Sequence, residues 1–207
     1  MPNAKLNYDY KKDKKFKDSP AAKVPWTKPI DFEILYQIDP RLNEPINKFG
    51  CNFMATLAIP QIVCHRALAP QAFLEIYTLA TNGSLGPNVL GRDCSCKENF
   101  WKCTNLAFQM LGHKEKTARW MWASERDGSG KFIGIDQAYK KPSFLPNADG
   151  RPMFFIVDFN TTSNKATYGG HHFTLFNSIG DLLYDPGGGS VHSWLSLSRI
   201  HCWKVFD

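Results

Sequence analysis

Residues 170–187 read GHHFTLFNSIGDLLYDPG and predict a β-hairpin. Two apolar runs flank the segment NSIGD, whose Asn, Gly and Asp residues tolerate the left-handed conformations of tight turns. Side chains alternate between the faces of a strand, so the length of the turn decides which histidine shares a face with Asp185. A turn of two or four residues places His172 on the same face as Asp185, whereas a turn of three residues places His171 there. We favour His172 and keep His171 as the alternative.

A second stretch, residues 48–59 (KFGCNFMATLAI), places a cysteine at the predicted start of a helix. Gly50 interrupts the chain and apolar residues then recur at helical spacing, which puts Cys51 in the first turn. Unpaired backbone N–H groups and the positive end of the helix dipole favour a thiolate at this position. A histidine held by a carboxylate is the base that such a nucleophile needs. Cys51, His172 and Asp185 are therefore the candidate catalytic residues.

The order of these motifs resembles the papain-like cysteine peptidase superfamily. A Cys at a helix start is followed by a His that opens a strand and by an Asp before Pro on the next strand. More narrowly, FGCNFMA, HFTL and YDP are similar to the bacterial branch of bacteriocin-processing peptidases and cell-wall peptide hydrolases, including its uncharacterised bacterial or phage families. The resemblance implies an α+β fold. N-terminal helices, with the nucleophile at a helix start, would pack on a C-terminal antiparallel β-sheet.

The resemblance also implies a reaction on an amide or isopeptide bond. Cys51 would attack the carbonyl, His172 would carry the proton, and Asp185 would orient the imidazole. The implied substrates are peptides, including peptidoglycan-like cross-links. Two alternatives stay open: a transferase or deamidase that uses the same triad, because a thioester can be resolved by an amine as well as by water, and a catalytically inactive module that keeps the fold.

The sequence departs from the superfamily pattern at the residue that would help to bind the oxyanion. The superfamily often supplies a Gln about six residues before the Cys to bind the oxyanion. Pro45 stands at that position here, and Asn47 and Asn43 are nearby amides that would replace it. We expect Asn47 to assist the backbone N–H of Cys51.

The sequence predicts neither a metal nor an organic cofactor. Cys94, Cys96, Cys103 and His113 provide four potential zinc ligands, but paired zinc cysteines are usually separated by two residues and here by one. His113 also lies ten residues beyond Cys103, which at a helical rise is too far for both side chains to bind one ion. We expect free thiols instead. Glycines 187–189 lack the Lys-Ser/Thr and the helix of a phosphate-binding loop.

Composition indicates one globular domain. The chain has 207 residues, 43% of them hydrophobic, and its mean hydropathy of −0.34 without a long apolar run excludes a spanning helix. Residues 1–28 hold eight Lys and three Asp, which accounts for most of the net charge of +6. We therefore expect a basic flexible tail at 1–28, a single papain-like domain at 29–207 and no nucleic-acid partner. No secretory signal is apparent, which predicts a cytoplasmic protein.

Hydrophobic periodicity and turn residues predict the remaining elements. Helices are expected over 51–68 with an interruption at Pro60, over 70–80 and over 98–111. Strands are expected over 119–122, 131–135, 153–159 and 201–206, and an irregular loop over 39–47.

Overall fold

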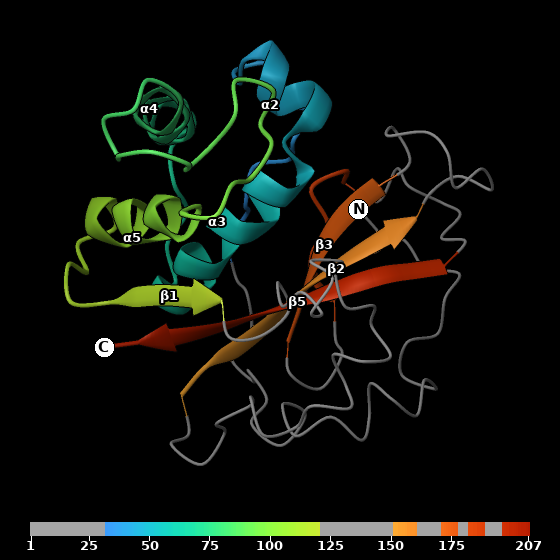
Figure 1. Ribbon diagram of the computed structural model, residues 1–207. Coiled ribbons are helices and arrows are strands. Elements are labelled where there is room, and N and C mark those ends of the chain that lie inside the picture. The colour runs from blue at the N-terminus through green and yellow to red at the C-terminus, as the bar shows by residue number, and fades with distance from the viewer. Residues whose placement is uncertain (1–31, 121–150, 161–170, 178–181, 189–195) are drawn as a thin grey trace, which may run out of the picture. The chain divides into compact units, whose positions relative to one another are not determined.

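The computed structural model describes residues 32–120, 151–160, 171–177, 182–188 and 196–207. Helices come first and strands follow, which confirms a mixed α+β fold with an antiparallel sheet (Figure 1). The helices are α2 (Glu44–Phe49), α3 (Cys51–Cys64), α4 (Pro70–Thr81) and α5 (Trp101–Met110). The strands are β1 (Thr117–Trp120), β2 (Met153–Asn160), β3 (His171–Asn177), β4 (Leu182–Tyr184) and β5 (Ser196–Phe206).

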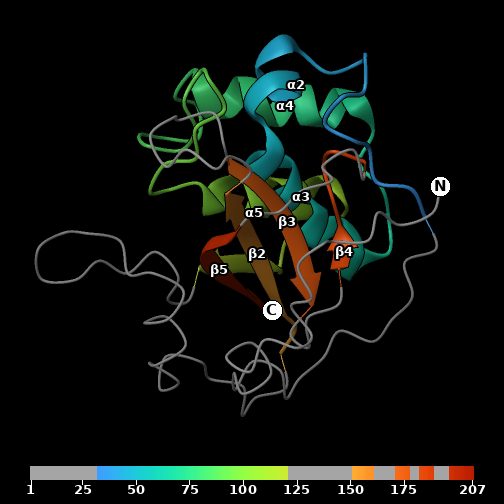
Figure 2. The same cartoon turned by 90° about the vertical axis from the view of Figure 1, so that its right-hand side faces the viewer.

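The strands form one sheet in the order β1-β5-β2-β3-β4. Strand β2 pairs antiparallel with both β3 and β5, and these three strands run side by side in Figure 2. Across the β2–β3 pair, Asp158 lies opposite Phe173 and Val157 lies opposite Thr174. All four of these residues are buried, although they alternate between the two faces. The centre of the sheet is therefore covered on both faces, as its nearly continuous apolar sequence indicates.

The described residues fall into two compact units. The helical unit contains residues 32–119 together with 184–188 and 205–207. The sheet unit contains Trp120, most of β2 to β5 and the residues next to them. The boundary passes within β4 and β5, so the chain returns twice to the helical unit after leaving it.

Helix α3 is the centre of the helical unit. Ten consecutive residues, from Phe53 to Ile62, are buried, as expected for a helix that is apolar on all sides. Helix α5 packs against α3, and α4 packs against α5. The rings of Phe53 and Phe100 lie 6.3 Å apart, centroid to centroid. No helix in the described part of the chain is long and apolar enough to cross a membrane.

The course of α3 corrects two expectations. Pro60 lies inside the helix without ending it, and the helix stops at Cys64 rather than near residue 68. His65 adopts a left-handed conformation with φ of 50°, and its N–H bonds back to the last turn. The buried side chain of Gln61 links the end of the helix to the chain that follows. Its amide donates to the Leu57 carbonyl (2.9 Å) and accepts from the Leu68 N–H (2.8 Å).

Other predicted elements shift or lie outside the described residues. The loop expected over 39–47 includes the start of α2, which Asn43 caps by accepting from the Ile46 N–H at 3.1 Å. Helix α4 is confirmed with Pro70 at its start, whereas α5 begins at Trp101, later than expected. Positions 1–28, 131–135 and the hairpin turn at 178–181 lie outside the described residues.

Gly50 joins α2 to α3 at a point where no side chain fits. A Cβ atom at this position would lie 2.5 Å from the Ile46 carbonyl oxygen and 2.9 Å from Ile46 Cα. The Gly50 N–H donates to that same oxygen at 2.9 Å, so the close approach belongs to the helix end itself. A φ of −82° is accessible to any residue, so backbone conformation does not require glycine here. The lack of space for a Cβ atom does.

We expect Gly50→Ala to lower the free energy of unfolding by about 1–3 kcal/mol, the usual cost of forcing extra atoms into a packed site. Urea titration of the intact chain measures the loss, and Gly50→Ser should cost more than Gly50→Ala. At Gly83, where nothing lies within 4 Å, Ala and Ser should cost the same, since only the left-handed backbone is penalised. Equal losses for Ala and Ser at Gly50 would contradict the steric explanation.

Candidate functional site

Cys51 is the first residue of α3 and is half-buried. Its N-cap residue, Gly50, offers no side chain to the backbone N–H groups of the first turn. In an uninterrupted helix the Asn47 carbonyl would accept the Cys51 N–H, but the helix breaks at Gly50 and this carbonyl accepts from Gln37 Nε2 at 3.0 Å. Cys51 therefore combines a thiol with a helix start that no side chain caps.

Asp185 forms a tight turn in the same helical unit. Its Oδ1 accepts from the Gly187 N–H at 2.9 Å, and its carbonyl accepts from the Gly188 N–H at 3.0 Å. Gly188 has φ of +64° and lies against the Tyr36 ring, where a Cβ would be 3.3 Å from the ring edge. Glycine thus shapes the turn, and Asp185 is buried within it.

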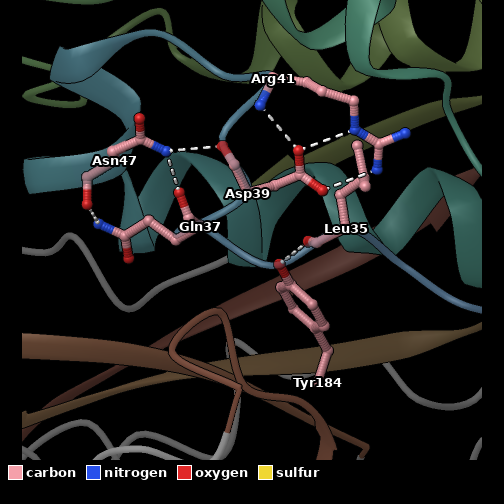
Figure 3. A network of polar contacts seen from close by, with 6 residues as sticks. All are labelled: Leu35, Gln37, Asp39, Arg41, Asn47 and Tyr184. Atoms are coloured by element: carbon pink, nitrogen blue, oxygen red, sulfur yellow. Dashed lines mark hydrogen bonds and ion pairs between the residues drawn. The ribbon is translucent and has the colours of Figure 1, made fainter.

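Tyr184 connects this turn to the segment that precedes α2. Its hydroxyl donates to the Leu35 carbonyl at 2.6 Å (Figure 3). Burial raises the pKa of Tyr184 well above its ordinary value, and the charges of Asp185, Tyr36 and Cys51 raise it further.

Asn47 and Gln37 form a reciprocal clamp between α2 and the segment before it. Asn47 Nδ2 donates to the carbonyls of Gln37 (2.6 Å) and Asp39 (3.1 Å), while Gln37 Nε2 donates back to the Asn47 carbonyl, as Figure 3 shows. The Gln37 N–H donates to the Pro186 carbonyl at 2.8 Å. Gln37 thus links the Asp185 turn to α2, the helix that precedes Cys51. Both side-chain amide protons of Asn47 form hydrogen bonds within the protein.

The two neighbouring histidines of β3 lie on opposite faces of the sheet. His172 is 7% exposed and is paired across the sheet with Phe159. His171 Nδ1 lies 2.9 Å from Oδ1 of Asp158, a carboxylate that is wholly buried. His171 therefore has a carboxylate partner on its own face. Sequence reasoning missed Asp158, although an acidic residue within the apolar run MFFIVDFN is the pattern that could have revealed it.

His172 belongs to the sheet unit, whereas Cys51, Asp185 and Asn47 belong to the helical unit. Within the helical unit, Cys51 begins α3, Asp185 forms the turn after β4, and Asn47 is engaged in the clamp. The choice between His172 and His171 as the catalytic base stays a prediction.

The six cysteines are free thiols, and their surroundings differ. Burial raises the pKa of Cys94 and of Cys103 to about 12, and that of Cys64 to about 11. In the described part of the chain, no three His, Cys, Asp or Glu side chains gather in a way that could hold a metal ion. His113, considered above as a zinc ligand, lies 3.0 Å from Glu115.

Comparisons with protein-family models, with curated protein sequences and with solved structures found no match.

The rate of alkylation by iodoacetamide should distinguish the individual cysteines. A thiol reacts as thiolate, so Cys64, Cys94 and Cys103 stay protonated and unreactive until the pH approaches about 11 to 12. We expect Cys51 to be modified much faster than these three at pH 7, as measured by peptide mapping of the native protein. Denaturation in urea should equalise the rates, and rapid modification of Cys94 or Cys103 in the folded chain would contradict the prediction.

Proposed function

We propose that the protein is a papain-like cysteine hydrolase, a peptidase or amidase. The observation that carries the proposal is the position of Cys51, half-buried as the first residue of a helix whose start no side chain caps. A nucleophilic thiol needs backbone donors, a base and a group that orients the base. The helical unit offers the backbone donors at the start of α3, and Asp185 is the candidate for the group that orients the base. Strand β3 offers a histidine as the base.

In the first half-reaction the Cys51 thiolate attacks the carbonyl carbon of an amide. The oxyanion receives hydrogen bonds from the backbone N–H groups at the start of α3, beginning with that of Cys51. We give Asn47 the role of holding the loop rather than of donating to the oxyanion, because its two amide protons already bond to carbonyls. His172 then protonates the leaving amine as the C–N bond breaks, which leaves an acyl thioester on Cys51.

In the second half-reaction water attacks the thioester. His172 takes a proton from this water, the C–S bond breaks, and a carboxylic acid and the Cys51 thiolate are released. Asp185 holds the imidazole in the tautomer that both steps need. Its turn is well suited to an orienting role, because the Gly187 N–H holds the carboxylate while the Gly188 N–H, bonded to the Asp185 carbonyl, closes the turn.

We assign the base to His172, as the hairpin pattern predicts, and keep His171, whose Nδ1 lies 2.9 Å from Asp158 Oδ1, as the alternative. The proposed substrates are peptides, including peptidoglycan-like cross-links, on the strength of the motifs FGCNFMA, HFTL and YDP. Six free thiols suit a reducing compartment, and we propose that the protein acts in the cytoplasm.

Matched histidine variants test the catalytic assignment. At pH 6 an ordinary thiol, with a pKa of about 8.5, is less than about 1% ionised, so a fast reaction of Cys51 requires an imidazolium partner. We expect His172→Gln to slow alkylation of Cys51 by iodoacetamide roughly tenfold or more at pH 6. His171→Gln, which keeps a donor for Asp158, should leave the rate unchanged.

The rate is measured by peptide mapping, and circular dichroism confirms that each variant is folded. An unchanged Cys51 rate in His172→Gln would refute the assignment, and a loss confined to His171→Gln would transfer the role to His171. Incubation of the native protein with a peptide mixture in ¹⁸O-labelled water, with and without an added amine, then separates hydrolysis from transfer by product mass. A reactive Cys51 that yields no product would favour the inactive module.

A further inference from the structure

Asn82 and Gly83 form the only Asn-Gly pair in the sequence, and they directly follow α4. Both residues are exposed, as is Ser84 after them. In such a pair the backbone nitrogen of the glycine can attack the side-chain carbonyl of the asparagine, because glycine has no Cβ atom to obstruct the approach. The end of α4 is therefore a place where the chain can modify itself, provided that the local structure leaves both groups available.

The backbone nitrogen of Gly83 is available for this attack. Among the residues that the structure describes, none accepts a hydrogen bond from the Gly83 N–H. Other N–H groups take the last carbonyls of α4: Thr78 accepts from Asn82 at 3.0 Å, and Leu79 accepts from Leu85 at 3.2 Å. Gly83 has φ of +87°, and a Cβ built on it would meet nothing within 4 Å. The backbone at Gly83 thus has room to move toward the Asn82 side chain.

A hydrogen bond prepares the side-chain carbonyl of Asn82. Its Oδ1 accepts from the Ser84 N–H at 2.9 Å, which folds the side chain over the peptide that joins Asn82 to Gly83. Negative charge develops on Oδ1 when Cγ is attacked, so this donor stabilises the oxyanion. Closing the ring also requires a rotation about the Asn82 ψ, which is −1° in the structure. The exposed end of a helix opens more readily than its middle, so this rotation is accessible.

Two other asparagines near α4 lack this combination. Asn88 is also exposed, but Val89 follows it, and the branched side chain of valine crowds the backbone nitrogen. The side-chain amide of Asn99 is engaged, because its Nδ2 donates to the Pro87 carbonyl at 3.0 Å. Asn88 therefore serves as an exposed control within the same chain.

We propose that Asn82 is a self-modification site, at which the side-chain amide becomes a carboxylate through a succinimide formed with Gly83. The Gly83 nitrogen loses its proton to water and attacks Asn82 Cγ. The Cγ–Nδ2 bond then breaks, and the amide nitrogen takes up a proton and leaves as ammonia. Water opens the succinimide at either carbonyl, which yields aspartate or isoaspartate. Water is the only co-reactant, and the site is independent of the proposed function.

Either product places a negative charge at the C-terminal end of α4. The dipole of a helix makes this end negative, so a carboxylate there is unfavourable. The last turn of α4 holds no basic side chain that would compensate. Helix α4 still buries Phe73, Ile76 and Ala80 and packs against α5. The modified chain therefore keeps the helix but holds its final turn less tightly.

Peptide mapping by mass spectrometry, after incubation of the intact folded chain at physiological pH and temperature, measures the conversion of each asparagine. We expect Asn82 to convert roughly tenfold or more faster than Asn88, because only Asn82 precedes a residue without a Cβ atom. Gly83→Ala should slow the conversion of Asn82 by a similar factor. Isoaspartate among the products identifies the succinimide route, since direct hydrolysis of the amide yields aspartate alone. Equal rates at Asn82 and Asn88, an unchanged rate in Gly83→Ala, or aspartate as the sole product would refute the proposal.

Hydrogen exchange tests the effect on α4. Asn82→Asp introduces the charge without rearranging the backbone. We expect the N–H groups at positions 82 and 85, which bond to Thr78 and Leu79, to exchange roughly two- to fivefold faster in this variant than in the native chain. Asn82→Gln, which adds no charge, is the matched control and should exchange more nearly as the native chain does. Equal exchange rates in Asn82→Asp and Asn82→Gln would refute the loosening of the final turn by charge.

Discussion

The side-chain amide of Asn47 is the interaction on which the candidate site depends. Its two protons bond to the carbonyls of Gln37 and Asp39, and this fixes the loop before α2 against the helix that ends beside Cys51. Gln37 extends the same contact to the Asp185 turn through Pro186. A primary amide is the smallest side chain that can supply two donors from one atom, so neither aspartate nor serine would hold both carbonyls.

Some of the site can be predicted from sequence because its signals are local. The break at Gly50 followed by an apolar run predicts that Cys51 begins a helix, and Pro70 predicts the start of α4. The cap formed by Asn43 also has a local signature, which the expectation of an irregular loop overlooked. These features depend on a residue and its nearest neighbours, and sequence patterns describe such relations well.

The rest depends on contacts between residues that are distant along the chain, and no periodic pattern encodes these. Asn47 was expected to serve the oxyanion, yet its bonds go to residues eight and ten positions earlier. The pairing of Asp158 with His171 depends on the register between two strands, which a sequence with apolar residues on both faces does not specify. Such a register is set by packing, so the carboxylate that engages a histidine becomes visible only in three dimensions.

The return of residues 184–188 to the helical unit has a consequence for the order of events during translation. Residues 32–119 emerge before strands β2 to β5, and at about 5–20 residues per second the ribosome needs several more seconds to deliver Tyr184. Until then the Leu35 carbonyl and the Gln37 N–H lack the partners that Tyr184 and Pro186 supply. The thiol of Cys51 is thus synthesised well before the turn that carries Asp185, and during that interval the segment before α2 lacks these two hydrogen bonds.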